Sequence, residues 1–176
     1  MHGDAWSNNF IFRYDQVTGK PVEVVLIDLQ MCHEGDQFKD VNSALYVSTS
    51  EDFRKKHLTS MLHIYYDTFT NICKDFSVPT LPGWSWEELN RRFHRAQMFG
   101  VYMAVSLLPL MLKNQDEIVD MDKLDISVED MKSEDFMKSD AMKKIMEEFM
   151  SMKKENPVLR SRLGGAVGDA VRAGVL

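Results

Sequence analysis

The spacing of apolar residues near the start of the chain predicts a β-hairpin. Aromatic side chains stand at every second position, Phe10, Phe12 and Tyr14, and are followed by a turn-like segment at 15–21. The next run, 22–27, consists mostly of β-favouring residues. We therefore expect a loop first and then two antiparallel strands.

Beyond the hairpin, the apolar positions recur at steps of three and four. This periodicity predicts an amphipathic helix over about 51–76. Ser85 and Glu88 have the spacing of a capping box, which predicts the start of a second long helix. Pro109 should kink or end that helix, because proline lacks the backbone N–H that continues it.

The last third of the chain is predicted to hold a connector and two closing helices. Residues 113–135 are acidic and weakly periodic, as in a solvated connector. Helices are expected near 136–152 and near 157–173, the second with Asn156 as N-cap and Pro157 at its first position. The predicted fold class is α+β and mostly helical, a hairpin followed by a helical bundle.

Composition narrows the functional classes. The chain has 176 residues, 44% of them apolar, which suits a single domain with a real core. Its net charge of -6 disfavours nucleic acid as a partner. Cys32 and Cys73 are too few for a disulfide framework and lack zinc-site spacing. With no signal-peptide or membrane-spanning segment in the sequence, we expect a cytoplasmic protein that is not bound to a membrane.

The first nine residues carry a motif with a chemical meaning. His2, Asp4 and Asn9 fit the pattern H-x-D-x-x-x-x-N, the spacing of the catalytic loop in protein kinases. In that loop, a carboxylate placed as Asp4 is placed can accept the proton of an attacking hydroxyl and orient it. Such a short pattern is not specific alone, so its setting in the hairpin matters. The structural alternative is a solvated loop aspartate with a buried aspartate at a strand end.

The predicted hairpin brings a second oxygen ligand to this loop. If the turn centres near residues 17–18, antiparallel pairing sets Asn9 beside Ile27 or Asp28. An amide oxygen and a carboxylate are then close together. These are hard ligands that Mg²⁺ accepts alongside nucleotide phosphates and water. The sequence therefore predicts a Mg²⁺ and ATP site at the base of the hairpin.

Together these motifs resemble the ecdysteroid kinase-like (CHK kinase-like) family of the protein-kinase-like superfamily, related to choline kinases and aminoglycoside phosphotransferases. Specificity is high over the first 45 residues, and the similarity extends towards the C-terminus. The residues that carry it are His2-Gly3-Asp4, Trp6, Asn9, Ile27-Asp28-Leu29-Gln30 and Asp40.

The resemblance implies a role for each of these positions. It makes Asp4 the catalytic base, and Asn9 and Asp28 the ligands of Mg²⁺ and thereby of ATP. It makes His2 a scaffold of the loop and Asp40 a structural residue that hydrogen-bonds the loop backbone. The implied fold is a protein-kinase-like C-terminal lobe, and the implied acceptor is a small-molecule alcohol, ecdysteroid-like in some relatives.

One part of a kinase is not found in the sequence. No G-x-G-x-x-G or Walker A motif occurs in it, although a kinase covers the phosphates with a glycine-rich loop and a strand lysine upstream of the catalytic loop. We therefore expect Met1 to be an internal methionine of a longer protein. Residues 1–176 would form the C-terminal lobe, with the catalytic loop and hairpin at 1–30 and a helical remainder at 31–176. The N-terminal ATP-binding lobe would be absent.

Three functions stay open at this point. The first is an ATP-dependent kinase of which this chain is a fragment, inactive alone. The second is a catalytically inactive C-lobe that acts as a binding module. The third is a metal-dependent hydrolase with His2, Asp4 and Asp28 as ligands, which would leave Asn9 without a role.

Overall fold

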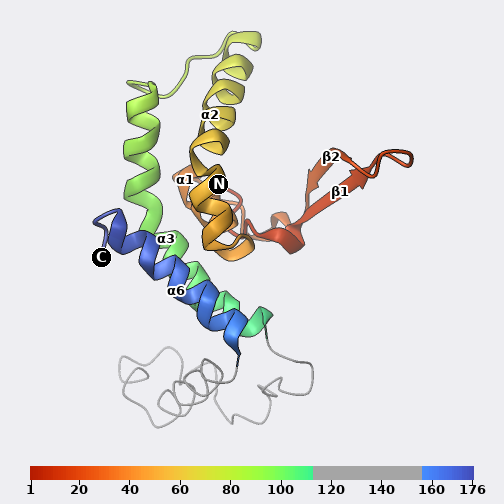
Figure 1. The fold of residues 1–176 in the computed structure, drawn as a ribbon. Coiled ribbons are helices and arrows are strands. Elements are labelled where there is room, and N and C mark those ends of the chain that lie inside the picture. Colours follow the sequence, from red (N-terminus) through yellow and green to blue (C-terminus); the bar gives the residue numbers. More distant parts are fainter. Residues whose placement is uncertain (113–155) are drawn as a thin grey trace, which may run out of the picture. The chain divides into compact units, whose positions relative to one another are not determined.

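A computed structural model describes residues 1–112 and 156–176 and shows a mostly helical α+β protein with one two-stranded sheet (Figure 1). The chain divides into two compact units, Met1–Ala104 with Gly165–Leu176, and Val105–Gly164. Every site discussed below lies in the first of these units. The predicted connector at 113–135 and the helix near 136–152 fall outside the described residues. None of the described helices is long and apolar enough to span a membrane.

The predicted hairpin is present. Strand β1 (Phe10–Tyr14) pairs antiparallel with β2 (Pro21–Leu26), and Phe10 lies opposite Leu26. The turn is held by Asp15, whose carboxylate accepts hydrogen bonds from the backbone N–H groups of Thr18 and Val17 and from the Thr18 hydroxyl. These bonds, that from the Thr18 N–H first, lower the pKa of Asp15. Nearly every strand residue is exposed, so neither face of the hairpin is covered.

Helix α1 (Gln37–Ser48) was not predicted from the sequence. Asp36 caps it by accepting the backbone N–H of Phe38. Its buried face includes the polar residues Asn42 and Ser43, which interrupt the apolar repeat that would have revealed it. The Asn42 amide donates to the backbone carbonyls of Phe38 and Phe93. The second of these bonds connects α1 to the later helix that contains Phe93.

Helices α2 (Glu51–Asp75) and α3 (Trp86–Met111) match the two long helices that the sequence predicts. The Ser85 hydroxyl accepts the Glu88 N–H, but the Glu88 carboxylate binds Arg91 and Arg92, so only half of the capping box forms. Those two arginines lower the pKa of Glu88 to about 2. Helix α3 continues through Pro109 and ends two residues later.

Close approach of α1 and α3 builds the core. A Cβ atom at Gly100 would lie 2.9 Å from the backbone oxygen of Asn42, so only glycine allows this contact. Beyond this crossing, stacked aromatic rings join α2 to the start of α3 and to the loop before it: His63 lies on Trp86, and Tyr66 lies on Trp84. The most deeply buried apolar side chains of α1 and α3 are Phe38, Tyr46, Val47, Leu89, Phe93, Ala104 and Leu108.

Helix α6 (Pro157–Arg172) closes the described chain and matches the helix predicted near 157–173. Asn156 is its N-cap as expected, because its side-chain oxygen accepts the backbone N–H of Leu159 at 2.9 Å. Its C-terminal part, from Gly165 onward, belongs to the first unit.

Candidate active site

The predicted catalytic loop, residues 2–9, lies between the start of the chain and β1. Gly3 adopts a φ of +87°, in the left-handed region that glycine tolerates. A Cβ atom at this position would collide with the backbone oxygen of Met31. Both constraints require glycine between His2 and Asp4. The sequence analysis gave Gly3 no role of its own, although its place between His2 and Asp4 in the catalytic-loop motif already pointed to one.

Asp40 holds the backbone of this loop. One carboxylate oxygen accepts the N–H of His2 at 2.5 Å and the other accepts the N–H of Gly3 at 2.9 Å. Asp40 stands in the first turn of α1, where a negative charge also suits the helix dipole. Two adjacent N–H groups of the loop are therefore fixed to one helix through a single side chain.

The buried His2 ring has both nitrogens engaged. Nδ1 lies 3.3 Å from the backbone nitrogen of Asp4, which can only donate to it. Nε2 must then carry the proton and donate to the carbonyl oxygen of Ile27, 2.9 Å away. His2 thus joins the loop to the end of β2 and keeps no free nitrogen to bind a metal.

Asn9 is buried and contacts Asp4 through its side-chain amide. The amide nitrogen lies 2.9 Å from the backbone oxygen of Asp4 and 2.9 Å from its Oδ2. Both partners are acceptors, so the nitrogen must point at Asp4, and the Asn9 Oδ1 points elsewhere. Among the described residues, neither Asn9 Oδ1 nor Asp4 Oδ1 has a hydrogen-bond partner.

Asp28 lies two residues after β2 and next to Ile27, which pairs with Asn9. The backbone N–H of Ile27 donates to the carbonyl oxygen of Asn9 at 3.0 Å, which is the neighbourhood that the hairpin register predicts. Asp28 has a φ of 61°, in the left-handed region, which is uncommon for a residue other than glycine and is typical of functional sites. Its side chain is exposed rather than buried, contrary to the structural alternative, and caps no helix.

The donor set suits a hard cation that also binds phosphate. The described ranges contain no group of three or more His, Cys, Asp or Glu side chains that could hold a metal alone. The Asn9 side-chain oxygen, which has no partner among the described residues, and the exposed Asp28 carboxylate would supply two oxygens. Mg²⁺ is usually bound in this way, by one or two protein oxygens together with phosphates and water.

Trp6 lies in the same loop and is partly buried. Its indole N–H is inaccessible to solvent and has no hydrogen-bond partner in the described part of the chain. The next residue, Ser7, is anchored, because its N–H donates to the Ser48 hydroxyl of α1 at 2.9 Å.

Comparison with known proteins supports the family that the motifs indicate. Residues 1–78 match the model of the Ecdysteroid kinase-like family, which confirms the expected family on the part of the chain that carries the loop, the hairpin, α1 and α2. No curated protein sequence and no solved structure matches the chain. The similarity expected for the remaining helices stays a prediction.

Proposed function

We propose that this chain is the C-terminal lobe of a small-molecule kinase that transfers the γ-phosphoryl group of ATP to an alcohol. The family match suggests kinase-like phosphotransferase activity. The observation that carries the proposal is the Asp4–Asn9 contact beside Asp28, held by Asp40 and His2. Phosphoryl transfer needs such fixed positions, because its catalysis consists mainly of positioning and charge neutralisation.

Asp4 is proposed to accept the proton of the acceptor hydroxyl. Its Oδ2 is occupied by the Asn9 amide, which fixes the orientation of the carboxylate, whereas Oδ1 has no partner among the described residues. A hydroxyl that donates to Oδ1 would be aligned for attack on the γ-phosphorus. It would pass its proton to Asp4 as the new O–P bond forms and the bond from the γ-phosphorus to the bridging oxygen breaks, which releases ADP.

Asn9 and Asp28 are proposed to hold Mg²⁺ through Asn9 Oδ1 and the Asp28 carboxylate. The ion would neutralise charge on the phosphates of ATP. The Asn9 amide would then have two tasks, since its nitrogen orients Asp4 and its oxygen would bind the cation. This shared residue would couple the position of the proton acceptor to that of the metal.

The sequence lacks a glycine-rich phosphate loop, so we propose that the nucleotide is also held by an N-terminal lobe of a longer protein. The hydrolase alternative has less support, because both ring nitrogens of His2 are hydrogen-bonded to the backbone. An ecdysteroid-like alcohol is the acceptor that we propose to test first, because of the family match.

Paramagnetic Mn²⁺ can test the metal site on this chain itself. In NMR spectra with ATP present, Mn²⁺ should broaden the resonances of Asn9 and Asp28 before those of Asp15 at the far end of the hairpin. Asp28→Asn should abolish this preference, and Asp15→Asn, which keeps its turn because asparagine forms the same local bonds, should not. Equal broadening at Asp15 and Asp28 in the wild type would contradict the site.

A further inference from the structure

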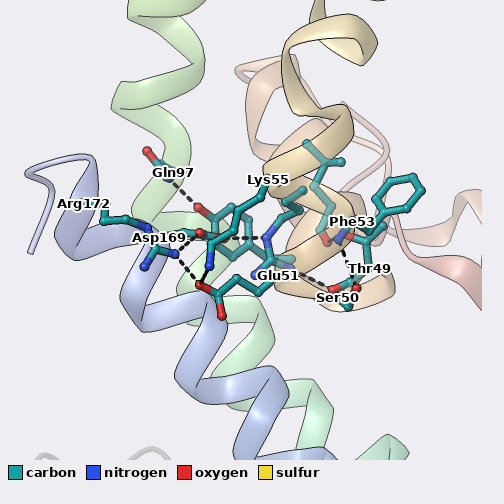
Figure 2. Close-up of polar contacts among 11 residues, drawn as sticks. Thr49, Ser50, Glu51, Phe53, Lys55, Gln97, Asp169 and Arg172 are labelled. Carbon is teal, nitrogen blue, oxygen red and sulfur yellow. Dashed lines mark hydrogen bonds and ion pairs between the residues drawn. The ribbon is translucent and has the colours of Figure 1, made fainter.

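A polar hollow of ≈ 280 Å³ lies on the same unit as the candidate active site and takes no part in the proposed phosphotransfer. Side chains of α1, α2, α3 and the end of α6 surround it, and Figure 2 shows part of its polar network. Its lining is Tyr46, Arg54, Lys55, Leu58, Thr59, Phe93, His94, Gln97, Asp169, Arg172 and Ala173.

Positive charge exceeds negative charge around this hollow, although the chain as a whole is acidic. Three cations among the lining residues, Arg54, Lys55 and Arg172, accompany one carboxylate, Asp169. Glu51 stands beside them and is shared by Lys55 and Arg172 at 2.6 Å each. Those hydrogen bonds, first that of Lys55, lower the pKa of Glu51 and so keep it ionised. When Glu51 is counted as well, three cations stand against two carboxylates, so this group of described residues keeps a net charge of +1.

Arg54 fixes a buried charge beneath the hollow. Its side chain is only 3% exposed, and Nε lies 2.7 Å from an Asp169 oxygen. Nη1 donates to the Thr49 carbonyl, the guanidinium lies over the Tyr46 ring, and Nη2 has no hydrogen-bond partner among the described residues. Asp169 balances the charge of this buried cation, and the unused N–H groups of Nη2 are what Arg54 can still offer to a ligand.

The remaining polar groups add no further negative charge. Gln97 donates its amide N–H to the Tyr46 hydroxyl at 2.5 Å, and burial raises the pKa of Tyr46, so the phenol stays neutral. Lys55 and Arg172 are about half exposed and each has more N–H groups than its carboxylate partners use. These spare donors, on α2 and α6, can turn towards one anion.

We propose that this hollow binds a small phosphate monoester with an apolar substituent. A phosphate accepts several charge-assisted hydrogen bonds at once, which suits an ammonium and a guanidinium on different helices. Leu58, Phe93 and Ala173 provide an apolar wall for the rest of the ligand. The volume limits the ligand to a small molecule, since most drug-sized ligands occupy larger pockets. This site is independent of the phosphotransfer proposal.

Calorimetric titration of the chain with phenyl phosphate at constant ionic strength tests the site. Saturable binding is expected, tighter than that of inorganic phosphate, which lacks the ring, and of phenol, which lacks the charge. Lys55→Gln should weaken binding by about tenfold, the effect of one lost charge-assisted hydrogen bond. The matched control is Lys56→Gln, which removes an exposed lysine of the same helix that does not line the hollow and should leave the affinity unchanged.

A gain of affinity provides a second test that does not depend on loss of structure. Thr59 lines the hollow from an exposed position of α2, so Thr59→Lys adds a cation there and should tighten phenyl phosphate binding. The proposal is overturned if phenyl phosphate does not bind saturably or if phenol binds as tightly. It is equally overturned if Lys55→Gln and Lys56→Gln behave alike, or if Thr59→Lys fails to strengthen binding.

Discussion

At the scale of single residues, Asp4 shares one hydrogen bond with Asn9 and keeps one carboxylate oxygen for the acceptor. Asp4→Asn should therefore lower the turnover of the longer kinase that we propose by roughly 10²–10⁴-fold, because the proton acceptor is lost. The KM for ATP should change little, since Asp4 contributes mainly in the transition state. Steady-state kinetics with varied ATP separate the two effects.

Two controls accompany that experiment, one for misfolding and one for the loss of any hairpin carboxylate. Asp4→Asn should retain the wild-type circular dichroism spectrum, because the Asp4 backbone oxygen still accepts the Asn9 amide. Asp15→Asn, at the far end of the hairpin, should keep wild-type turnover. Unchanged turnover in Asp4→Asn would remove Asp4 from the mechanism.

Asp40 should affect stability rather than chemistry. Asparagine at this position offers one acceptor oxygen in place of two, so either the His2 or the Gly3 N–H loses its partner. The expected cost for Asp40→Asn is about 2 kcal/mol of unfolding free energy. For a protein of this size, this lowers the melting temperature by about 4–8 °C. Asp52→Asn, an exposed position on α2, should leave the melting temperature nearly unchanged, and an equal effect in both variants would contradict the role of Asp40.

Sequence spacing could predict the neighbourhood of Asn9 and Asp28, because hairpin register follows from the turn and the alternation of side chains. The orientation of each group could not be predicted. The His2 tautomer depends on Ile27, and the need for glycine at position 3 depends on Met31, both of which are distant in sequence. The left-handed conformation of Asp28 likewise leaves no trace in a periodic pattern.

At the scale of elements, the Arg54–Asp169 pair connects the start of α2 to the end of α6. Asp169→Asn would leave a buried guanidinium without its countercharge. We expect a loss of roughly 3–5 kcal/mol in unfolding free energy, the usual effect of breaking a buried pair. Urea denaturation followed by circular dichroism measures it.

The exposed Arg13–Glu23 pair of the hairpin is the matched control, with side chains 68% and 52% exposed. Glu23→Gln should cost less than about 1 kcal/mol, because water already screens this pair. If the two substitutions cost the same, Asp169 does not hold α6 to α2.

The helices were predictable in proportion to the regularity of their apolar faces. Helices α2, α3 and α6 have recognisable starts at Ser50, Ser85 and Asn156, where a side-chain oxygen accepts a backbone N–H. Helix α1 is short, and tertiary contacts bury its Asn42, so no periodic signal marked it. The capping box at Ser85 lacks the bond from the Ser85 backbone N–H to the Glu88 carboxylate, because Arg91 and Arg92 bind that carboxylate instead. Local spacing does not determine which of these partners Glu88 takes.

At the scale of the whole molecule, the hairpin stands out among the described elements because nearly all of its strand residues are exposed. Ile11 is 54% exposed and Val25, its partner on β2, is 51% exposed. On the other face, Phe10 and Phe12 border an apolar hollow of ≈ 440 Å³ formed with α1 and α2. A two-stranded hairpin is at best marginally stable alone. Such surface usually marks a contact site or promotes association.

The chain alone is therefore expected to self-associate through the hairpin. Ile11→Thr with Val25→Thr should reduce association in sedimentation velocity and lower the fluorescence of a bound apolar dye. Threonine keeps the β-branched shape but puts a hydroxyl in place of the ethyl group of Ile11 and of a methyl group of Val25. The melting temperature should barely change, since both side chains are already half in water. The control variant carries Val158→Thr and Val171→Thr, which replace two similarly exposed valines on α6, and it should leave association unchanged. A wild-type chain that is monomeric at all concentrations would show that the hairpin surface does not drive association.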